Sequence, residues 1–238
     1  MKKTLPSTVL GIGAHPDDLE ISCGGTLAKY ARQGCRVVMV CMTDGRYGRL
    51  HAPEKMIEVR RKETRAAAAL LKAELKMMGH SDLGLADNPE SRLEMVDIIR
   101  ETAPDVILTH DPSDLNPDHR VVSKLAYDSL IPCITQTFKT SRPPCKRMPI
   151  LYYMNTVCGT NFNPEEYVDI SETISLKLKM LSMHRSQMET YRRFEKRDMM
   201  KFVEAMAVVY GFRCGVQHAE GFRRIPIWTQ TSVSRWLP

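Results

Sequence analysis

Short, almost wholly apolar runs alternate along the chain with longer segments in which apolar residues recur every three to four positions. Runs of the first kind, bounded by turn-forming residues, are typical of strands buried on both faces of a parallel sheet, and segments of the second kind are typical of helices. The predicted strands are 8–13, 36–42, 74–78, 106–110, 150–156 and 167–170; the predicted helices are 21–33, 54–72, 91–101, 119–130, 177–197 and 201–210.

This order predicts an α/β fold, a Rossmann-like three-layer sandwich with a mostly parallel sheet. A length of 238 residues suits one substantial core, and no repeat or low-complexity linker divides the chain, so residues 1–238 are expected to form a single domain. The Pro-rich stretch 131–149 is expected to be a loop. The C-terminal third is expected to elaborate the sheet.

A formal net charge of +6 is modest, and the basic residues are dispersed except between 177 and 197. There, Leu176, Met180, Met183 and Tyr191 recur at roughly helical spacing, which favours a helix with a solvated basic face over a phosphate-binding stripe. Nucleic acid is therefore not an expected partner. A homo-oligomer is compatible with the composition.

Seven cysteines form no CxxC pair, which indicates small buried thiols in a reducing compartment and not a disulfide framework. The N-terminus runs directly into the motif described next, so it does not read as a signal peptide. No run approaches the roughly 18 apolar residues that a membrane span needs. We therefore expect a cytoplasmic protein without a membrane span.

The segment GIGAHPDDLE (11–20) places His15 and the carboxylates of Asp17, Asp18 and Glu20 at the end of the first predicted strand. Ligands of open α/β sheets collect outside the carboxyl ends of the strands, so these side chains are expected to face a crevice. His15 and Asp18 can reach one small cation, and this leaves Asp17 free to act as a base. Oxygen and nitrogen donors without a thiolate suit catalytic Zn²⁺ or a similar divalent ion.

Helix capping is the alternative explanation, since an Asp at a helix start accepts backbone N–H bonds. One cap needs one carboxylate, however, and three within four positions repel one another unless a cation or buried donors compensate. The segment also lacks the third glycine of a dinucleotide-binding turn.

A second polar loop, 111–120, follows the predicted strand 106–110. Asp118 can cap the next helix, and a cation-prone His119 in its first turn is poorly placed unless it is neutral and ligating. Two strand ends thus supply His15, Asp18 and His119, which are three protein ligands with an open position, as in a catalytic zinc site.

Other polar positions have less distinct patterns. Arg60 shares a helix side with Glu63, so it either faces the crevice and binds substrate or forms a surface ion pair. Asp87 lies in a predicted loop and is either a substrate ligand or a turn residue. The polar tail 217–223 could close over the site.

These motifs resemble the PIG-L/LmbE-like family of zinc-dependent N-acetylglucosaminyl deacetylases. The resemblance covers most of the chain, and its carriers are AHPDDLE, TDGRYG, the R-x-x-E helix at 60–63, LGLAD at 83–87, PDVILTH with PDHR, HRSQ at 184–187 and AEGFR near the end. It implies one Zn²⁺ held by His15, Asp18 and His119, a metal-activated water, Asp17 as general base, and Arg60 and Asp87 on sugar hydroxyls. The implied substrate is a small N-acetylated amino sugar or a related conjugate.

One position departs from the family. Many members have HPDH where this chain has Asn116-Pro-Asp-His119, and the leading histidine is thought to stabilise the oxyanion. Asn116 can donate a hydrogen bond to an oxyanion but cannot deliver a proton. Either Asp17 serves as both base and acid, or His110 or His218 supplies the proton; Asp118 and His110 are the alternative bases.

Two rival functions remain open at this point. A metal-dependent phosphoesterase usually needs two ions and more carboxylate and histidine ligands than the sequence offers. A non-catalytic sugar-binding relative could retain the fold, and Asn116 is the residue that favours it.

Overall fold

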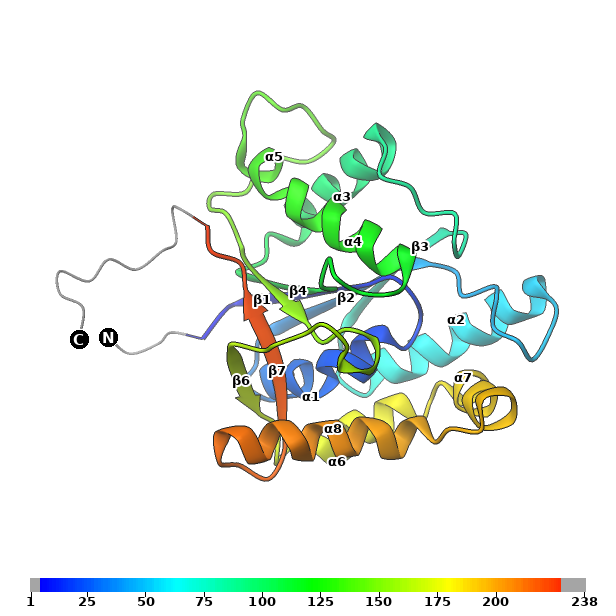
Figure 1. Ribbon diagram of the computed structural model, residues 1–238. Helices are drawn as coiled ribbons and strands as arrows, with labels where there is room; N and C mark the ends of the chain where they lie inside the picture. The colour runs from blue at the N-terminus through cyan, green and yellow to red at the C-terminus, as the bar shows by residue number, and fades with distance from the viewer. Residues whose placement is uncertain (1–4, 228–238) are drawn as a thin grey trace.

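The computed structural model describes residues 5–227, which form α-helices and strands around one seven-stranded sheet (Figure 1). The strands are β1 Thr8–Gly13, β2 Arg36–Thr43, β3 Glu74–His80, β4 Val106–Thr109, β5 Ile150–Met154, β6 Glu166–Asp169 and β7 Ala219–Arg224. The α-helices are α1 Asp18–Arg32, α2 Pro53–Ala69, α3 Pro89–Thr102, α4 Pro117–Asp128, α5 Leu130–Ile134, α6 Ile174–Leu181, α7 Arg185–Thr190 and α8 Met199–Cys214.

The sheet has the order β3-β2-β1-β4-β5-β7-β6, and its first five strands are parallel. β1 lies between β2 and β4, with Leu10 opposite both Val38 and Ile107. The chain therefore leaves β1 toward one side of the sheet and later returns to β4 on the other. The carboxyl ends of β1 and β4 form the topological switch point at which such sheets bind ligands.

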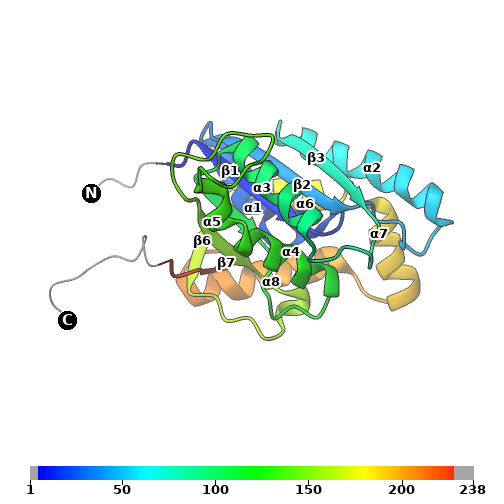
Figure 2. The same ribbon diagram turned by 90° about the horizontal axis from the view of Figure 1, so that it is seen from above.

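Two apolar layers pack against opposite faces of the sheet (Figures 1 and 2). Leu10 and Ile12 of β1 face the layer of α3, α4 and α5, whereas Val9 faces the layer of α1, α2 and α6. This alternation follows from the strand period of two, with apolar residues at both parities because both faces are covered. The predicted α/β sandwich with a mostly parallel sheet is confirmed.

The C-terminal third differs from the prediction at two places. The expected continuous helix 177–197 is interrupted: α6 ends at Leu181, α7 begins at Arg185, and a single π-helical turn covers Tyr191–Glu195. The expected solvated basic face holds for the other lysine and arginine side chains of the segment, which are exposed, but Lys177 is 1% exposed. The sequence pattern missed this break because Ser182, Met183 and His184 have no helix-breaking character of their own.

The polar tail is not a cover for the site. Its residues form β7, which pairs antiparallel with β5 and with β6 inside the sheet. Contacts of Glu220 hold β7 at this position in the sheet. Its carboxylate accepts hydrogen bonds from Gly25 N and Thr26 N of α1 at 2.9 and 2.7 Å, and it forms an ion pair with Lys177. Part of the expected loop 131–149 is also ordered, as the short helix α5.

Among residues 5–227, no helix combines the length and apolar character needed to cross a bilayer.

Candidate active site

The turn between β1 and α1 has an unusual backbone at Asp17, where φ is 97°. Asp17 occupies the N-cap position of α1, but its side chain makes no capping hydrogen bond. Asp18 instead folds back and accepts the backbone N–H of His15 at 2.6 Å. Capping therefore does not explain this acidic cluster, and a left-handed non-glycine residue at a cleft is a form of strain common at functional sites.

The loop between β4 and α4 is held by its own polar side chains. Asn116 caps α4 by accepting the N–H of Asp118 at 2.9 Å, so the predicted cap by Asp118 is wrong. Asp114 accepts the N–H of Asn116 at 2.9 Å and that of Val157 at 3.0 Å. These bonds leave the Asp118 and His119 side chains directed inward, where they are 1% and 4% exposed as residues.

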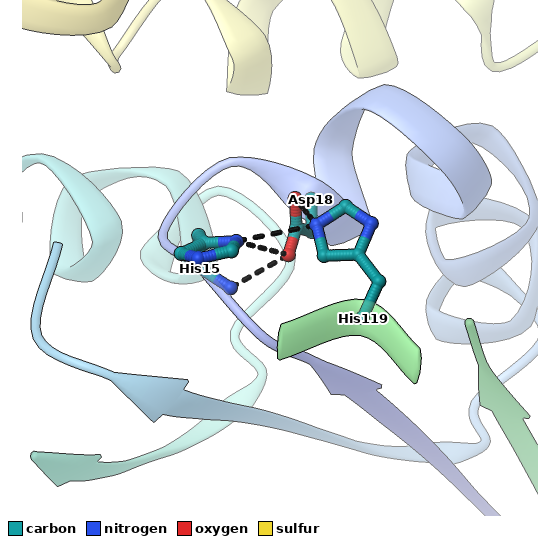
Figure 3. A group of neighbouring side chains, drawn as sticks. All are labelled: His15, Asp18 and His119. Atoms are coloured by element: carbon teal, nitrogen blue, oxygen red, sulfur yellow. Dashed lines mark hydrogen bonds and ion pairs between the residues drawn. The ribbon is translucent and has the colours of Figure 1, made fainter. Parts of the chain in front are cut away.

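The two loops meet at His15, Asp18 and His119 (Figure 3). His15 Nδ1 lies 3.2 Å from His119 Nε2 and 3.4 Å from Asp18 Oδ2, while His119 Nε2 lies 3.3 Å from Asp18 Oδ1. The sequence thus identified three side chains that the fold brings together from two distant loops. Each offers one ligand atom, and these atoms lie within 4.8 Å of one another.

Each of the two imidazoles has a carboxylate behind it. His15 Nε2 lies 3.1 Å from Asp118 Oδ2, and His119 Nδ1 lies 3.1 Å from Asp114 Oδ2. A carboxylate on the far nitrogen fixes the tautomer and turns the other nitrogen toward a metal. Asp118 is therefore placed to orient His15.

The electrostatics of the triad favour a cation. Burial alone lowers the pKa of His15, but Asp118 and Asp18 outweigh it and raise that pKa to about 10. Burial likewise opposes protonation of His119, and Asp18 and Asp114 raise its pKa to about 9. The carboxylates thus hold positive charge at two nitrogens that face each other, which is the role a divalent ion would fill. The donor set of two nitrogens and a carboxylate fits Zn²⁺.

Asp17 lies beside this triad and is bound by Arg60. The guanidinium donates to Asp17 Oδ1 at 3.0 Å and to the carbonyl of Pro16, while Asp17 Oδ2 is buried without a hydrogen-bond partner. Burial raises the pKa of Asp17 to about 6, against the lowering effect of Arg60. Of the two alternatives for Arg60, the structure has it face the crevice; Glu63 binds Ser186 instead.

A cavity of about 400 Å³ opens above these residues. Its far walls come from the loop after β2, the loop after β5, α7, the π-helical turn and α8, segments in which the sequence indicated no site residue. The cavity-lining residues of these walls and of Asp82–Leu83 are Tyr47, Gly48, Arg49, Asp82, Leu83, Asn155, Thr156, Val157, Cys158, Gln187, Thr190, Tyr191, Glu195, Met199 and Phe202.

Sequence reasoning missed two carboxylates that build the site. Asp114 supports His119, and Asp82 shapes the loop after β2 by accepting Gly45 N at 2.9 Å and Tyr47 N at 3.2 Å. Gly45 has a φ of 71°, and a Cβ there would lie 2.7 Å from Arg60 Cδ, so a glycine is required for the guanidinium to reach Asp17. In the sequence, the glycine of TDGRYG was the one sign that another group approaches this loop closely.

Four predicted residues do not line the cavity: Asp118, which lies behind His15, and Asp87, His218 and His110. Asp87 pairs with Arg92 at 2.5 Å and Lys124 at 3.3 Å, so its assignment to a sugar hydroxyl is not supported. His218 lies at the start of β7, where its backbone bonds Ser171, and it does not reach the cavity either.

His110 is 1% exposed and lies behind the triad, stacked on His119 with ring centroids 3.8 Å apart. Its Nε2 accepts the N–H of Ala14 at 2.9 Å. Burial, followed by the charge of His119, lowers the pKa of His110 to about 4. A neutral imidazole whose nitrogen already accepts from the backbone positions the β1–α1 turn and is badly placed to deliver a proton.

The chain is similar in sequence and in structure to known deacetylases. Residues 10–130 match the model of the PIG-L family, described as GlcNAc-PI de-N-acetylase. A diacetylchitobiose deacetylase of Thermococcus kodakarensis is 28% identical over 92% of this chain and 83% of its own length. The structure of N,N'-diacetylchitobiose deacetylase from Pyrococcus horikoshii aligns with a TM-score of 0.82 at 31% identity, covering 93% of this chain and 84% of that one.

A 4-oxalmesaconate hydratase of Pseudomonas putida is also similar, at 23% identity over 85% of this chain and 82% of its own length. The fold therefore does not determine the reaction by itself. The matched family segment begins in β1 and ends in α5, so it contains both loops that form the triad. This chain belongs to the PIG-L family of GlcNAc-PI de-N-acetylases.

Proposed function

We propose that this protein is a Zn²⁺-dependent hydrolase that removes the acetyl group from the nitrogen of a small N-acetylated amino sugar or a related conjugate. The observation that carries the proposal is the juxtaposition of a three-ligand site with Asp17, a buried carboxylate that has one oxygen held by Arg60 and the other without a partner. His15, Asp18 and His119 would hold the ion. When bound, the ion supplies a Lewis acid for the acetyl carbonyl and a nucleophile at neutral pH.

Asp17 acts as the general base. Its partner-free Oδ2 takes a proton from the attacking water and returns it to the departing amine, so one group serves as base and then acid. Arg60 holds Oδ1 and keeps the carboxylate at the cavity edge. This double use removes the need for His110 or His218 as a separate acid.

Asn116 serves the developing oxyanion. Its Oδ1 is occupied by the N–H of Asp118, which leaves the two amide hydrogens as donors, and Asn116 lines the cavity. An amide donor at an oxyanion is sufficient for this role and needs no titration. The asparagine is therefore compatible with catalysis and does not favour a non-catalytic binding protein.

A phosphoesterase with two ions is less well supported. Among residues 5–227, a second group that could hold a metal consists of His110, Asp114 and His119, and it shares His119 with the first. His110 Nε2 in that group already accepts from Ala14 N, and Asp114 supports His119. Two separate ions would compete for one imidazole.

The cysteines support a reducing compartment, and we propose the cytoplasm, since the seven thiols are all free. Whether the chain forms a homo-oligomer stays a prediction.

The test is product analysis with purified, zinc-loaded protein. N-acetylglucosamine and N,N'-diacetylchitobiose should each be assayed for primary amine and acetate, with Asp17→Asn as the low-activity control and p-nitrophenyl phosphate as the phosphoesterase substrate. We expect equal amounts of amine and acetate from at least one sugar. Phosphate release without amine release, or no product from a panel of N-acetylated sugars, sugar glycosides and thiol conjugates, would overturn the proposal.

A further inference from the structure

Two of the seven cysteines meet in the structure, although nothing in their sequence spacing indicates it. Cys133 lies in α5, and Cys145 lies in the segment 135–149 that connects α5 to β5. Cys145 N donates to Cys133 O at 2.9 Å. The Cys133 thiol donates to Leu130 O at 3.1 Å, and the Cys145 thiol donates to Ile99 O at 3.6 Å. Both side chains belong to the same apolar cluster.

This arrangement matches the requirements of a disulfide. A backbone hydrogen bond that directly joins two residues brings their Cα atoms to about 5 to 6 Å, inside the span that a disulfide bridges. The backbone hydrogen bond already sets the chain path, so closure needs the two thiols to turn from Leu130 O and Ile99 O toward each other.

The two thiols also differ in a way that suits exchange. Cys133 is fully buried, whereas Cys145 is partly exposed and can meet a reagent. The hydrogen bond from Cys133, together with the charge of Arg100, lowers the pKa of the Cys145 thiol to about 7. Burial raises the pKa of Cys23 and Cys41 well above the usual value, which makes those thiols unreactive.

Arg100 ties this pair to its surroundings. Its buried guanidinium donates to the carbonyl of Cys133 at 3.2 Å, to those of Pro132 and Thr135 at 2.8 Å each, and to that of Arg142 at 3.0 Å. The same cation that holds the end of α5 and the middle of the segment therefore lies beside Cys133 and Cys145, where it also stabilises a thiolate.

We propose that Cys133 and Cys145 form a thiol–disulfide exchange site, which small-molecule disulfides such as oxidised glutathione convert to an intramolecular disulfide. The Cys145 thiolate attacks one sulfur of the small disulfide, and the first small thiolate leaves. Cys133 loses its proton and attacks the Cys145 sulfur, which releases the second small thiolate. One small disulfide is reduced to two thiols, and the protein loses two hydrogens.

The site lies apart from the catalytic cavity, since neither cysteine lines it. Oxidation therefore joins the segment 135–149 covalently to α5 and should act on stability. A disulfide that closes a short loop typically raises the melting temperature of a chain of this size by roughly 5 to 10 °C.

The experiment treats the native protein with a series of glutathione buffers from fully reduced to fully oxidised, then alkylates it and maps the peptides. We expect a Cys133–Cys145 crosslink that forms with oxidation and disappears with reduction, while the exposed Cys158 and Cys214 carry glutathione. Cys145→Ser should lose both the crosslink and the rise in melting temperature, and Cys214→Ser should retain both.

Stable glutathione on Cys145 without the crosslink would overturn the proposal, because Cys133 would then fail to resolve the mixed disulfide. If oxidation raised the melting temperature of Cys145→Ser as much as that of the unsubstituted protein, the disulfide would not be the cause of the stabilisation. The peptide map of the unsubstituted protein gives the main result, so the test does not depend on how well either variant folds.

Discussion

The cavity has a floor and a wall that are built on different principles. The floor, residues 14–18 and 110–119, comes from two turns that follow buried strands, and its side chains are held by hydrogen bonds within and between those turns. The C-terminal part of the wall, within residues 155–220 and called the wall below, is held by partners far apart in sequence, such as Lys177 with Glu220. The floor therefore contains the residues that take part in the reaction, and the wall contributes to the stability of the fold that holds them in place.

The Lys177–Glu220 pair joins the two regions through α1. Lys177 Nζ donates to the carbonyl of Ile21 at 2.7 Å, while Glu220 accepts from two backbone N–H groups in the middle of α1. Asp18 begins that same helix. Changes in the floor should thus alter turnover with little loss of stability, and changes in the wall should do the reverse.

The largest effect is expected from Asp18→Asn. An amide is a poor metal ligand, and it also weakens the hydrogen bond that Asp18 accepts from His15 N, so the ion should be lost and activity should become undetectable. Elemental analysis measures the metal content of the variant. In the wild type, a chelator should abolish activity and added Zn²⁺ should restore it. Full metal occupancy in Asp18→Asn, His15→Ala and His119→Ala together would contradict the ligand assignment.

Asp17→Asn should separate the base from the ligands. The kcat should fall by about 10² to 10⁴ with metal content near wild type, because the amide cannot accept the proton. In the wild type, kcat should also fall as the pH drops through about 6, where the Asp17 carboxylate becomes protonated, and this limb should be absent in the variant. A variant with near-normal turnover and pH profile would exclude Asp17 as the base.

The wall is tested by Lys177→Met, which leaves Glu220 buried without its cation. Breaking one side of a buried pair costs about 3 to 5 kcal/mol, so the free energy of unfolding in urea should fall by that amount while kcat of the folded fraction stays near wild type. Lys179→Met, an exposed lysine on the same helix, is the matched control. Unchanged stability would mean that the pair does not hold the wall to α1.

This contrast also explains how far the sequence could be interpreted. The buried strands and the floor follow local rules: apolar runs predict parallel strands, and polar residues at their ends predict a crevice. For that reason the sequence could predict that His15, Asp18 and His119 lie together. It could not predict the burial of Lys177 or the insertion of β7 into the sheet, because each depends on a partner far along the chain. Asp87 is the opposite case: it belongs to a recognisable motif, yet in the structure it forms surface ion pairs.

A smaller effect is expected from Asp118→Asn, which keeps the shape behind His15 but removes the charge. Loss of such a carboxylate typically lowers metal affinity by 10- to 100-fold, because the imidazole becomes less basic and less well oriented. Competition with a chelator at fixed pH measures it, and Asp114→Asn should behave alike through His119. If Asp118→Asn instead kept its metal and lost kcat 10²-fold or more, Asp118 would be the base after all.

The smallest effect is expected from Arg60→Lys, and it distinguishes two roles for this residue. As a substrate clamp, Arg60 would contribute to binding, and its loss would raise KM with kcat unchanged. As the holder of Asp17, it donates from one nitrogen, Nη2, to both Pro16 O and Asp17 Oδ1. Lysine retains the charge, but its side chain is one atom shorter and lacks the planar guanidinium that fixes the direction of these bonds. The loss of one hydrogen bond to a charged group then lowers kcat by about tenfold with KM and metal content near wild type. Arg61→Lys, on the exposed side of the same helix, controls for general effects on α2. A rise in KM alone would show that Arg60 binds the substrate. In that case the β1–α1 turn, with Asp17 in its left-handed conformation, would position the Asp17 carboxylate without a contribution from Arg60.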